Sequence, residues 1–142
     1  MANTGNKLTI GTIAANGLIL IGAGHGVGPL LVLEIIFLTG GYGSLNELKF
    51  SMTGSYNSTI TAACLFSFIG TVTLFISLFN VPKLYRVTGI VSLWVGFIYI
   101  VHSFFRGDNI AAFSFWTGTP FLVCSMILFV KTILSYKEPS AE

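Results

Sequence analysis

The chain alternates between long apolar runs and short polar connections. Four runs approach the length of about 20 residues that a helix needs to cross the hydrocarbon core of a bilayer. They cover roughly residues 8–28, 58–80, 84–105 and 110–134. Each is expected to be helical, because backbone polar groups inside a membrane must be satisfied within the segment and the runs lack the alternation of a transmembrane β-barrel. The pattern predicts an all-α integral membrane protein, a four-helix bundle forming one domain over residues 1–142.

The composition agrees with a membrane protein. Of the 142 residues, 54% are hydrophobic and 8% are charged, whereas charged residues make up about 25% of a soluble domain. The mean hydropathy is +0.85. The net charge of +2 is small, and the basic residues lie mostly near the ends of the runs rather than in a patch for a nucleic acid. The expected location is a lipid bilayer, either the plasma membrane or a bacterial inner membrane.

The distribution of basic residues predicts the orientation, because cytoplasmic loops are enriched in Lys and Arg. With a cytoplasmic N-terminus, five basic residues fall on the inner side and two on the outer side: Lys7, Lys83, Arg86, Lys131 and Lys137 against Lys49 and Arg106. Both termini are therefore predicted to be cytoplasmic. Residues 39–57 then form the one long loop, on the outer side, and the short turns favour antiparallel packing of the last three helices.

The first run ends in the stretch GAGHGVGP, residues 22–29, where glycines alternate around His25. In a helix, Pro29 lacks an amide hydrogen and its ring crowds the carbonyl of His25. The stretch therefore predicts a kinked first helix with an irregularity that faces protein or a wet cavity. Two glycine pairs spaced by four residues would let another helix backbone approach closely: Gly22 with Gly26, and Gly24 with Gly28.

Two further segments bear on the helices. PLLVLEIIFL, residues 29–38, either extends the first helix beyond the kink or lies along the outer interface with Glu34 facing water. In the fourth run, Pro120 would release the carbonyl of Trp116 and kink that helix. Ser114 and Gly118 form another small pair beside it.

The candidate binding residues are the polar side chains predicted in the outer half. His25 and His102 are expected at similar depths, and Tyr99, His102 and Arg106 fall along one stripe of the third helix. Glu34 and Asp108 are expected at the outer mouth, within reach of Arg106. Two structural explanations compete with a site. A histidine flanked by glycines often only hydrogen-bonds to a neighbouring helix, and such charged groups often form a solvated rim.

Catalytic and metal chemistry find little support. Cys64 and Cys124 lie in apolar runs without C-x-x-C spacing, so they are expected to be small buried hydrophobes. Glu34, Asp108 and the two histidines would hold a metal only if they converged. No catalytic or metal-binding residue is therefore assigned, and an enzyme is the least favoured function.

Three functions fit this sequence. The first is a non-catalytic subunit or an oligomeric interaction protein, whose small-residue faces pack against other membrane subunits or against further copies of the chain. The second is a binding or electron-transfer module, in which His25 and His102 hold haem b, a quinone or a lipid. The third is a channel or transporter protomer, in which the proline-broken outer halves line a path and the histidines relay protons.

Overall fold

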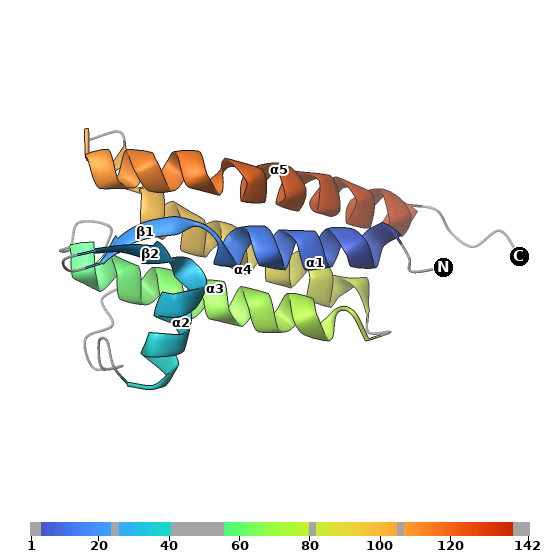
Figure 1. Cartoon of the computed structure of the whole chain (residues 1–142). Coiled ribbons are helices and arrows are strands. Elements are labelled where there is room, and N and C mark those ends of the chain that lie inside the picture. Colours follow the sequence, from blue (N-terminus) through green and yellow to red (C-terminus); the bar gives the residue numbers. More distant parts are fainter. Residues whose placement is uncertain (1–3, 24–25, 41–55, 80–81, 105–106, 138–142) are drawn as a thin grey trace, which may run out of the picture.

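The computed structural model describes residues 4–23, 26–40, 56–79, 82–104 and 107–137. In this part of the chain five helices and one two-stranded hairpin follow one another: α1 (Thr4–Gly17), β1 (Leu20–Ala23), β2 (Gly26–Pro29), α2 (Leu30–Leu38), α3 (Tyr56–Ile76), α4 (Lys83–Val101) and α5 (Asn109–Lys137). Helix α4 runs antiparallel to α3 and α5, and α1 lies beside them, antiparallel to α5 (Figure 1). As a result, α1 begins and α5 ends at the same end of the bundle.

Three helices in the described residues are long and apolar enough to cross a membrane. The stretches are Thr59–Ile76, Lys83–Val101 and Asn109–Ser135, with mean hydropathies between 1.7 and 2.0. They correspond to the second, third and fourth predicted runs. The prediction of a mostly helical membrane protein is confirmed to that extent, while the fourth span is not found.

The first run is the one that the prediction got wrong. Residues 8–28 do not form a single helix, because α1 ends at Gly17 and the chain continues as an antiparallel hairpin. At 1.5 Å per residue, 14 residues reach about 21 Å, which is short of the hydrocarbon thickness of about 30 Å. Glycine disfavours a helix by about 1 kcal/mol relative to alanine, and this segment has many glycines. β-Branched residues favour strands. Here Ile21 is paired with Gly28 and Val27 with Gly22 across the hairpin.

The glycine and proline positions therefore have other roles than the predicted ones. The strand register joins Leu20 with Pro29 and Gly22 with Val27, so Gly22, Gly26 and Gly28 lie in strands and not on the faces of a helix. Pro29 does not kink a helix. It ends β2 and precedes α2 with φ −67° and ψ 143°, an extended conformation from which a helix can start. Gly24 and His25, which connect the strands in the sequence, lie outside the described residues.

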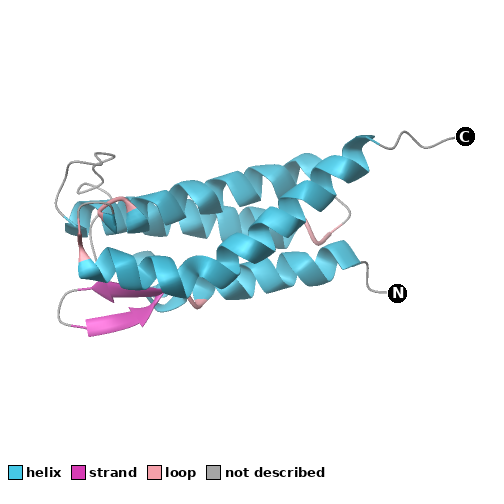
Figure 2. Ribbon diagram, turned by 90° about the horizontal axis from the view of Figure 1, so that it is seen from above, coloured by secondary structure: helices cyan, strands magenta, loops and turns pink. Residues whose placement is uncertain are grey.

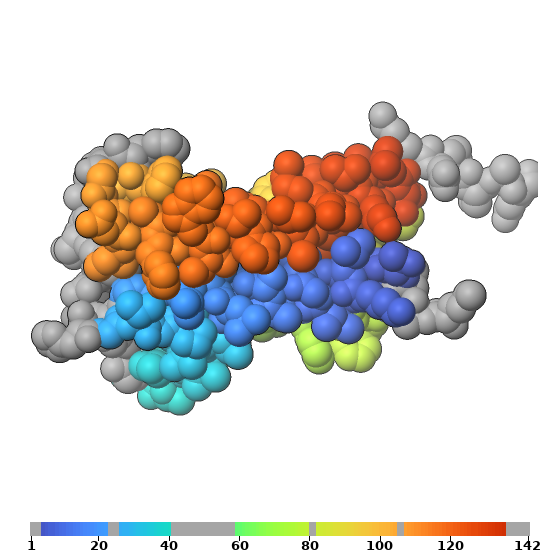
Figure 3. All heavy atoms as spheres, turned by 45° about the horizontal axis from the view of Figure 1, so that its top comes forward, coloured from blue at the N-terminus to red at the C-terminus, as the bar shows by residue number. Residues whose placement is uncertain are grey.

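The hairpin is tied to the helices by backbone and side-chain hydrogen bonds. The amide of Leu30 donates to the carbonyl of Ile19 at 2.8 Å and closes the hairpin base. On the other edge of β1, the amide of Leu20 donates to the hydroxyl of Thr117 on α5 at 3.2 Å. Figures 2 and 3 show α1 and the hairpin lying along α5. Helix α5 covers β1, whereas Gly26 and Val27 of β2 are exposed.

Replacing Thr117 with valine is expected to destabilise the fold by about 1 kcal/mol, because the part-buried amide of Leu20 loses its acceptor. The measurement is the free energy of unfolding in mixed detergent, followed by circular dichroism. Thr119→Val is the matched control, since the Thr119 hydroxyl is exposed and bonds the Phe115 carbonyl of its own helix. Equal stability of the two variants would contradict the role given to Thr117.

Glycines allow the helices to approach one another closely. A Cβ atom on Gly96 would lie 3.1 Å from the carbonyl oxygen of Ala63, across the α3–α4 contact. A Cβ atom on Gly118 would lie 2.3 Å from the ring of Phe97, across the α4–α5 contact. Helix α5 continues through Pro120, and its kink stays a prediction.

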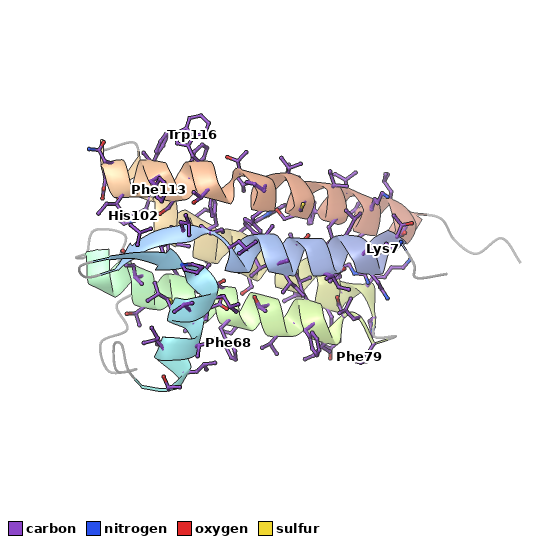
Figure 4. All side chains as sticks on the ribbon, viewed as in Figure 1. Lys7, Phe68, Phe79, His102, Phe113 and Trp116 are labelled. Atoms are coloured by element: carbon purple, nitrogen blue, oxygen red, sulfur yellow. The ribbon has the colours of Figure 1, made fainter. Side chains whose placement is uncertain are left out.

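The bundle is apolar outside and partly polar inside. Leu18 and Trp116 are each 69% exposed, and the aromatic rings of Phe79 and Trp116 point away from the bundle (Figure 4). By contrast, α1 buries four residues that are polar or lack a side chain: Thr9, Thr12, Asn16 and Gly17. This inversion is expected where lipid surrounds a protein and polar side chains need partners within it.

Candidate functional site

The candidate site is centred on Glu34, the one acidic side chain of α2. The glutamate is 3% exposed, so the alternative in which residues 29–38 lie along the outer interface with Glu34 facing water is wrong. The cause is the hairpin, which returns the chain to the end of α1, so that α2 starts partway along the bundle (Figure 1). The inward positions of α2 include Leu30, Leu33 and Glu34, and the outward ones include Leu31, Val32 and Ile35. With lipid outside, the carboxyl belongs on the inner face.

Glu34 meets neutral polar groups from two other helices. Ser67 of α3 forms a side-chain hydrogen bond with the carboxyl. The amide of Asn16, at the end of α1, donates to the hydroxyl of Ser67 at 2.7 Å. Cys64, one turn before Ser67, is close enough for an electrostatic interaction with Glu34. We call Asn16, Glu34, Cys64 and Ser67 the carboxyl cluster.

One oxygen of this carboxyl lacks a partner among the described residues. Oε1 of Glu34 is fully buried and accepts no hydrogen bond, although an unsatisfied buried polar group costs about 1–3 kcal/mol and a charged one more. No basic side chain of the described residues acts on the carboxyl. Helix α2 lies outside the three long apolar helices, and burial there raises the pKa of Glu34, while the hydrogen bond to Ser67 acts in the opposite direction. The group is therefore suited to hold a proton or another small cation.

A line of polar side chains leads from one end of the bundle to this cluster. On α1, Asn6, Thr9, Thr12 and Asn16 recur at intervals of three or four residues, which is helical spacing. The side-chain oxygen of Asn6 accepts from Arg86 at 3.1 Å. Thr9 and Thr12 are fully buried, and their hydroxyls bond backbone carbonyls of their own helix. We call these four residues the α1 polar stripe.

The sequence predicted six ligand-binding residues, and no other described member of this set acts on the Glu34 carboxyl. Of those six, His25 and Arg106 lie outside the described residues. His102 is half-buried, with its Nδ1 2.9 Å from the carbonyl oxygen of Tyr99. The ring of Tyr99 stacks on Phe66 at a centroid distance of 5.8 Å. Whether the two histidines face each other stays a prediction.

Asp108 has a local structural role at the start of α5. Its carboxylate accepts the amide of Ile110 at 2.9 Å and the hydroxyl of Ser103 at 3.1 Å. These bonds are typical of a residue that caps a helix N-terminus. The predicted cluster of Glu34 with Asp108 at the outer mouth is therefore not formed, because Glu34 is buried against α3.

Metal-binding residues do not converge in the described part of the chain. No group of three or more His, Cys, Asp or Glu side chains there could hold a metal ion. Cys64 is buried and Cys124 is half-buried, and both are free thiols. The arrangement around Glu34 has a single acidic ligand and neutral oxygen, amide and thiol groups, which suits a proton better than a multivalent ion.

Comparison with known proteins adds no family to these observations. No protein-family model, curated protein or solved structure matches the chain. The function is therefore argued from the carboxyl cluster and its surroundings.

Proposed function

We propose that this protein is a multi-pass membrane transport protein that carries protons, with Glu34 as the group that binds and releases them. The observation that carries this proposal is the buried, unpartnered Oε1 of Glu34. Ionisable side chains inside a membrane are rare and are typical of proton relays and ion pathways. A carboxyl without a counter-cation takes up a proton readily, and its neutral hydrogen-bonding neighbours allow both states.

The α1 polar stripe is the proposed route on one side of Glu34. Asn6 and Asn16 are ten residues apart, which corresponds to about 15 Å along a helix. The route begins at the end of the bundle where Lys7, Lys83, Arg86 and Lys131 lie, and the positive-inside rule makes this end cytoplasmic. Both termini would then lie in the cytoplasm. The irregular backbone of the hairpin is the proposed boundary of the route on the other side.

This proposal is a revised form of the channel or transporter hypothesis. Glu34 takes the relay role that the sequence suggested for His25 and His102. The subunit and oligomer hypothesis stays a prediction, because the apolar outer faces of α3, α4 and α5 suit lipid as well as another chain. Few helices surround the route in one copy, and association of several copies would be compatible with transport. Haem or quinone binding through the histidines also stays a prediction.

The test is proton flux into liposomes that contain the purified protein and a pH-sensitive dye, driven by a potassium diffusion potential. Wild-type protein is expected to acidify the lumen faster than empty vesicles do. The Glu34→Gln variant is expected to acidify it only as fast as empty vesicles do. Asp108→Asn is the matched control, because asparagine caps a helix as well as aspartate, and its flux should equal that of the wild type. Wild-type flux no greater than that of empty vesicles, or full flux in Glu34→Gln, would overturn the proposal.

A further inference from the structure

A second site lies at the end of the bundle where α1 and α4 begin and α5 ends. A cavity of about 370 Å³ opens there, and its walls come from all three helices. Three of its lining residues are basic: Lys83, Arg86 and Lys131. Its volume falls within the range of about 300–1,000 Å³ that is typical of small-molecule sites. The cavity is separate from Glu34, which lies partway along the bundle.

The charge of this cavity is not neutralised by the described residues. Their two carboxylates lie elsewhere, Glu34 in the interior and Asp108 at the turn before α5. Three positive charges that share one partly enclosed space repel one another. This repulsion is stronger than in water, because the dielectric constant of a protein is lower. The excess positive charge favours an anionic ligand.

The geometry of Arg86 adds a second, independent observation. One of its terminal nitrogens donates to Asn6 at 3.1 Å and to the carbonyl of Ser77 at 3.3 Å, which fixes the guanidinium. Its Nε–H group is buried and has no acceptor in the described part of the chain. Arginine binds phosphate through several parallel N–H donors, and here a held guanidinium has a donor unused. Lys83 is also held, because its ammonium donates to the carbonyl of Ser135 at 2.7 Å.

The apolar part of the wall indicates which kind of anion fits. Leu128 and Leu134 line the cavity beside the three cations. This combination is found at the end of two helices long enough to span a membrane, Lys83–Val101 and Asn109–Ser135. Basic pockets between helices at the membrane surface are suited to lipid headgroups, whose phosphates lie next to acyl chains.

We infer that this cavity binds a phosphate-bearing anion, held by Lys83, Arg86 and Lys131. The ligand chemistry has two sources, the phosphate of an anionic phospholipid and a free phosphate ion. The phosphate of either source accepts from the guanidinium of Arg86, which lines the cavity, and pairs with the ammonium of Lys131. The lipid source places its glycerol and acyl carbons against Leu134, which is exposed.

The test uses native mass spectrometry of the full-length protein in neutral detergent, titrated with phosphatidylglycerol in one arm and with inorganic phosphate in the other. Wild-type protein is expected to retain one phosphatidylglycerol molecule and to prefer it over phosphatidylcholine. Lys131→Gln and Arg86→Gln are each expected to weaken this binding about tenfold, which corresponds to about 1.4 kcal/mol. Lys7→Gln is the matched control, because Lys7 is a cation at the same end of the bundle (Figure 4) that does not line the cavity.

The two arms distinguish the sources. Saturable binding of inorganic phosphate that displaces the lipid would identify a free phosphate as the ligand, and retention of the lipid in excess phosphate would identify the headgroup. The titration is repeated with a variant that combines Glu138→Gln and Glu142→Gln. These two acidic residues follow α5 in the sequence, and the variant removes their negative charges from competition with an anionic ligand. Binding of neither ligand to either protein would overturn the inference. An equal loss of binding in Lys7→Gln and Lys131→Gln would also overturn it, since general surface charge would then be sufficient.

Discussion

Replacing Glu34 with glutamine is expected to stabilise the folded protein at neutral pH. Above the ordinary pKa of a carboxyl group, the stability of the variant is expected to depend less on pH than that of the wild type. In the unfolded chain Glu34 ionises near its ordinary pKa of 4.5, while burial raises its pKa in the folded protein. Between these two pKa values the folded state keeps a proton that the unfolded state has released. The free energy of unfolding therefore falls as pH rises through this window, by up to about 1.4 kcal/mol per pH unit.

The sign of this effect follows from the neutral form of the side chain. The stability associated with Glu34 is fully present below pH 4.5, is lost as pH rises towards the raised pKa, and is constant above it. Glutamine carries no charge at any of these pH values, so the difference between variant and wild type should grow through the window and then level off.

The measurement is the free energy of unfolding in mixed detergent at a series of pH values, for the wild type, Glu34→Gln and Asp108→Asn. The aspartate variant changes one carboxyl to an amide outside the carboxyl cluster and keeps a good helix cap, so it is the matched control for a carboxyl-to-amide change. Parallel curves for the wild type and Glu34→Gln would contradict the burial of an unpaired carboxyl.

The pH series also separates two ways in which the proposed function could fail. If Glu34→Gln differs from the wild type in stability but the wild type shows no proton flux, Glu34 is a buried titratable group that is not part of a route. If Glu34→Gln loses flux but has the same stability as the wild type at every pH, the proton that limits the rate is bound elsewhere. Only the combination of both effects in one variant joins the geometry of the carboxyl cluster to transport.

Sequence reasoning identified the three long helices because their signal is local. A run of about 20 apolar residues has one common structure in a bilayer, and α3, α4 and α5 follow the predicted runs closely. The first run failed because apolar residues are equally suitable for a buried helix and a buried hairpin, and run length does not distinguish the two. The glycines from Gly17 to Gly28 carried the distinguishing signal, but their spacing by four also fits close helix packing.

The site was harder to predict because it depends on contacts between distant segments. Glu34 was visible as an acid in an apolar stretch, yet its surroundings follow from where the hairpin places the start of α2. The contact of Asn16 with Ser67 joins residues 51 positions apart, and no local pattern encodes it. The α1 polar stripe did have a signal, since Asn6, Thr9 and Asn16 recur with helical spacing in an otherwise apolar run.

Replacing Gly70 with leucine is expected to cause a large loss of stability, because this glycine lies where α3 packs closely on α4. A Cβ atom at this position would lie 2.6 Å from Leu93 and 2.9 Å from the backbone carbonyl of Gly89. A side chain can rotate away but the carbonyl belongs to the α4 backbone, so α3 and α4 must separate. Overpacking of a core typically costs about 1–3 kcal/mol and occasionally more, and we expect the upper end of this range.

The matched control is Gly11→Leu, because a Cβ atom on Gly11 of α1 meets nothing within 4 Å. That variant should be as stable as the wild type or slightly more so, since leucine favours a helix by nearly 1 kcal/mol relative to glycine. Unfolding in mixed detergent compares the two. Equal stability would mean that α3 and α4 do not pack as closely as described.

Ser67 lies one turn before Gly70, so a displaced α3 also moves the hydroxyl that bonds Glu34. The Gly70 variant should therefore lose proton flux along with stability, whereas Gly11→Leu should keep both.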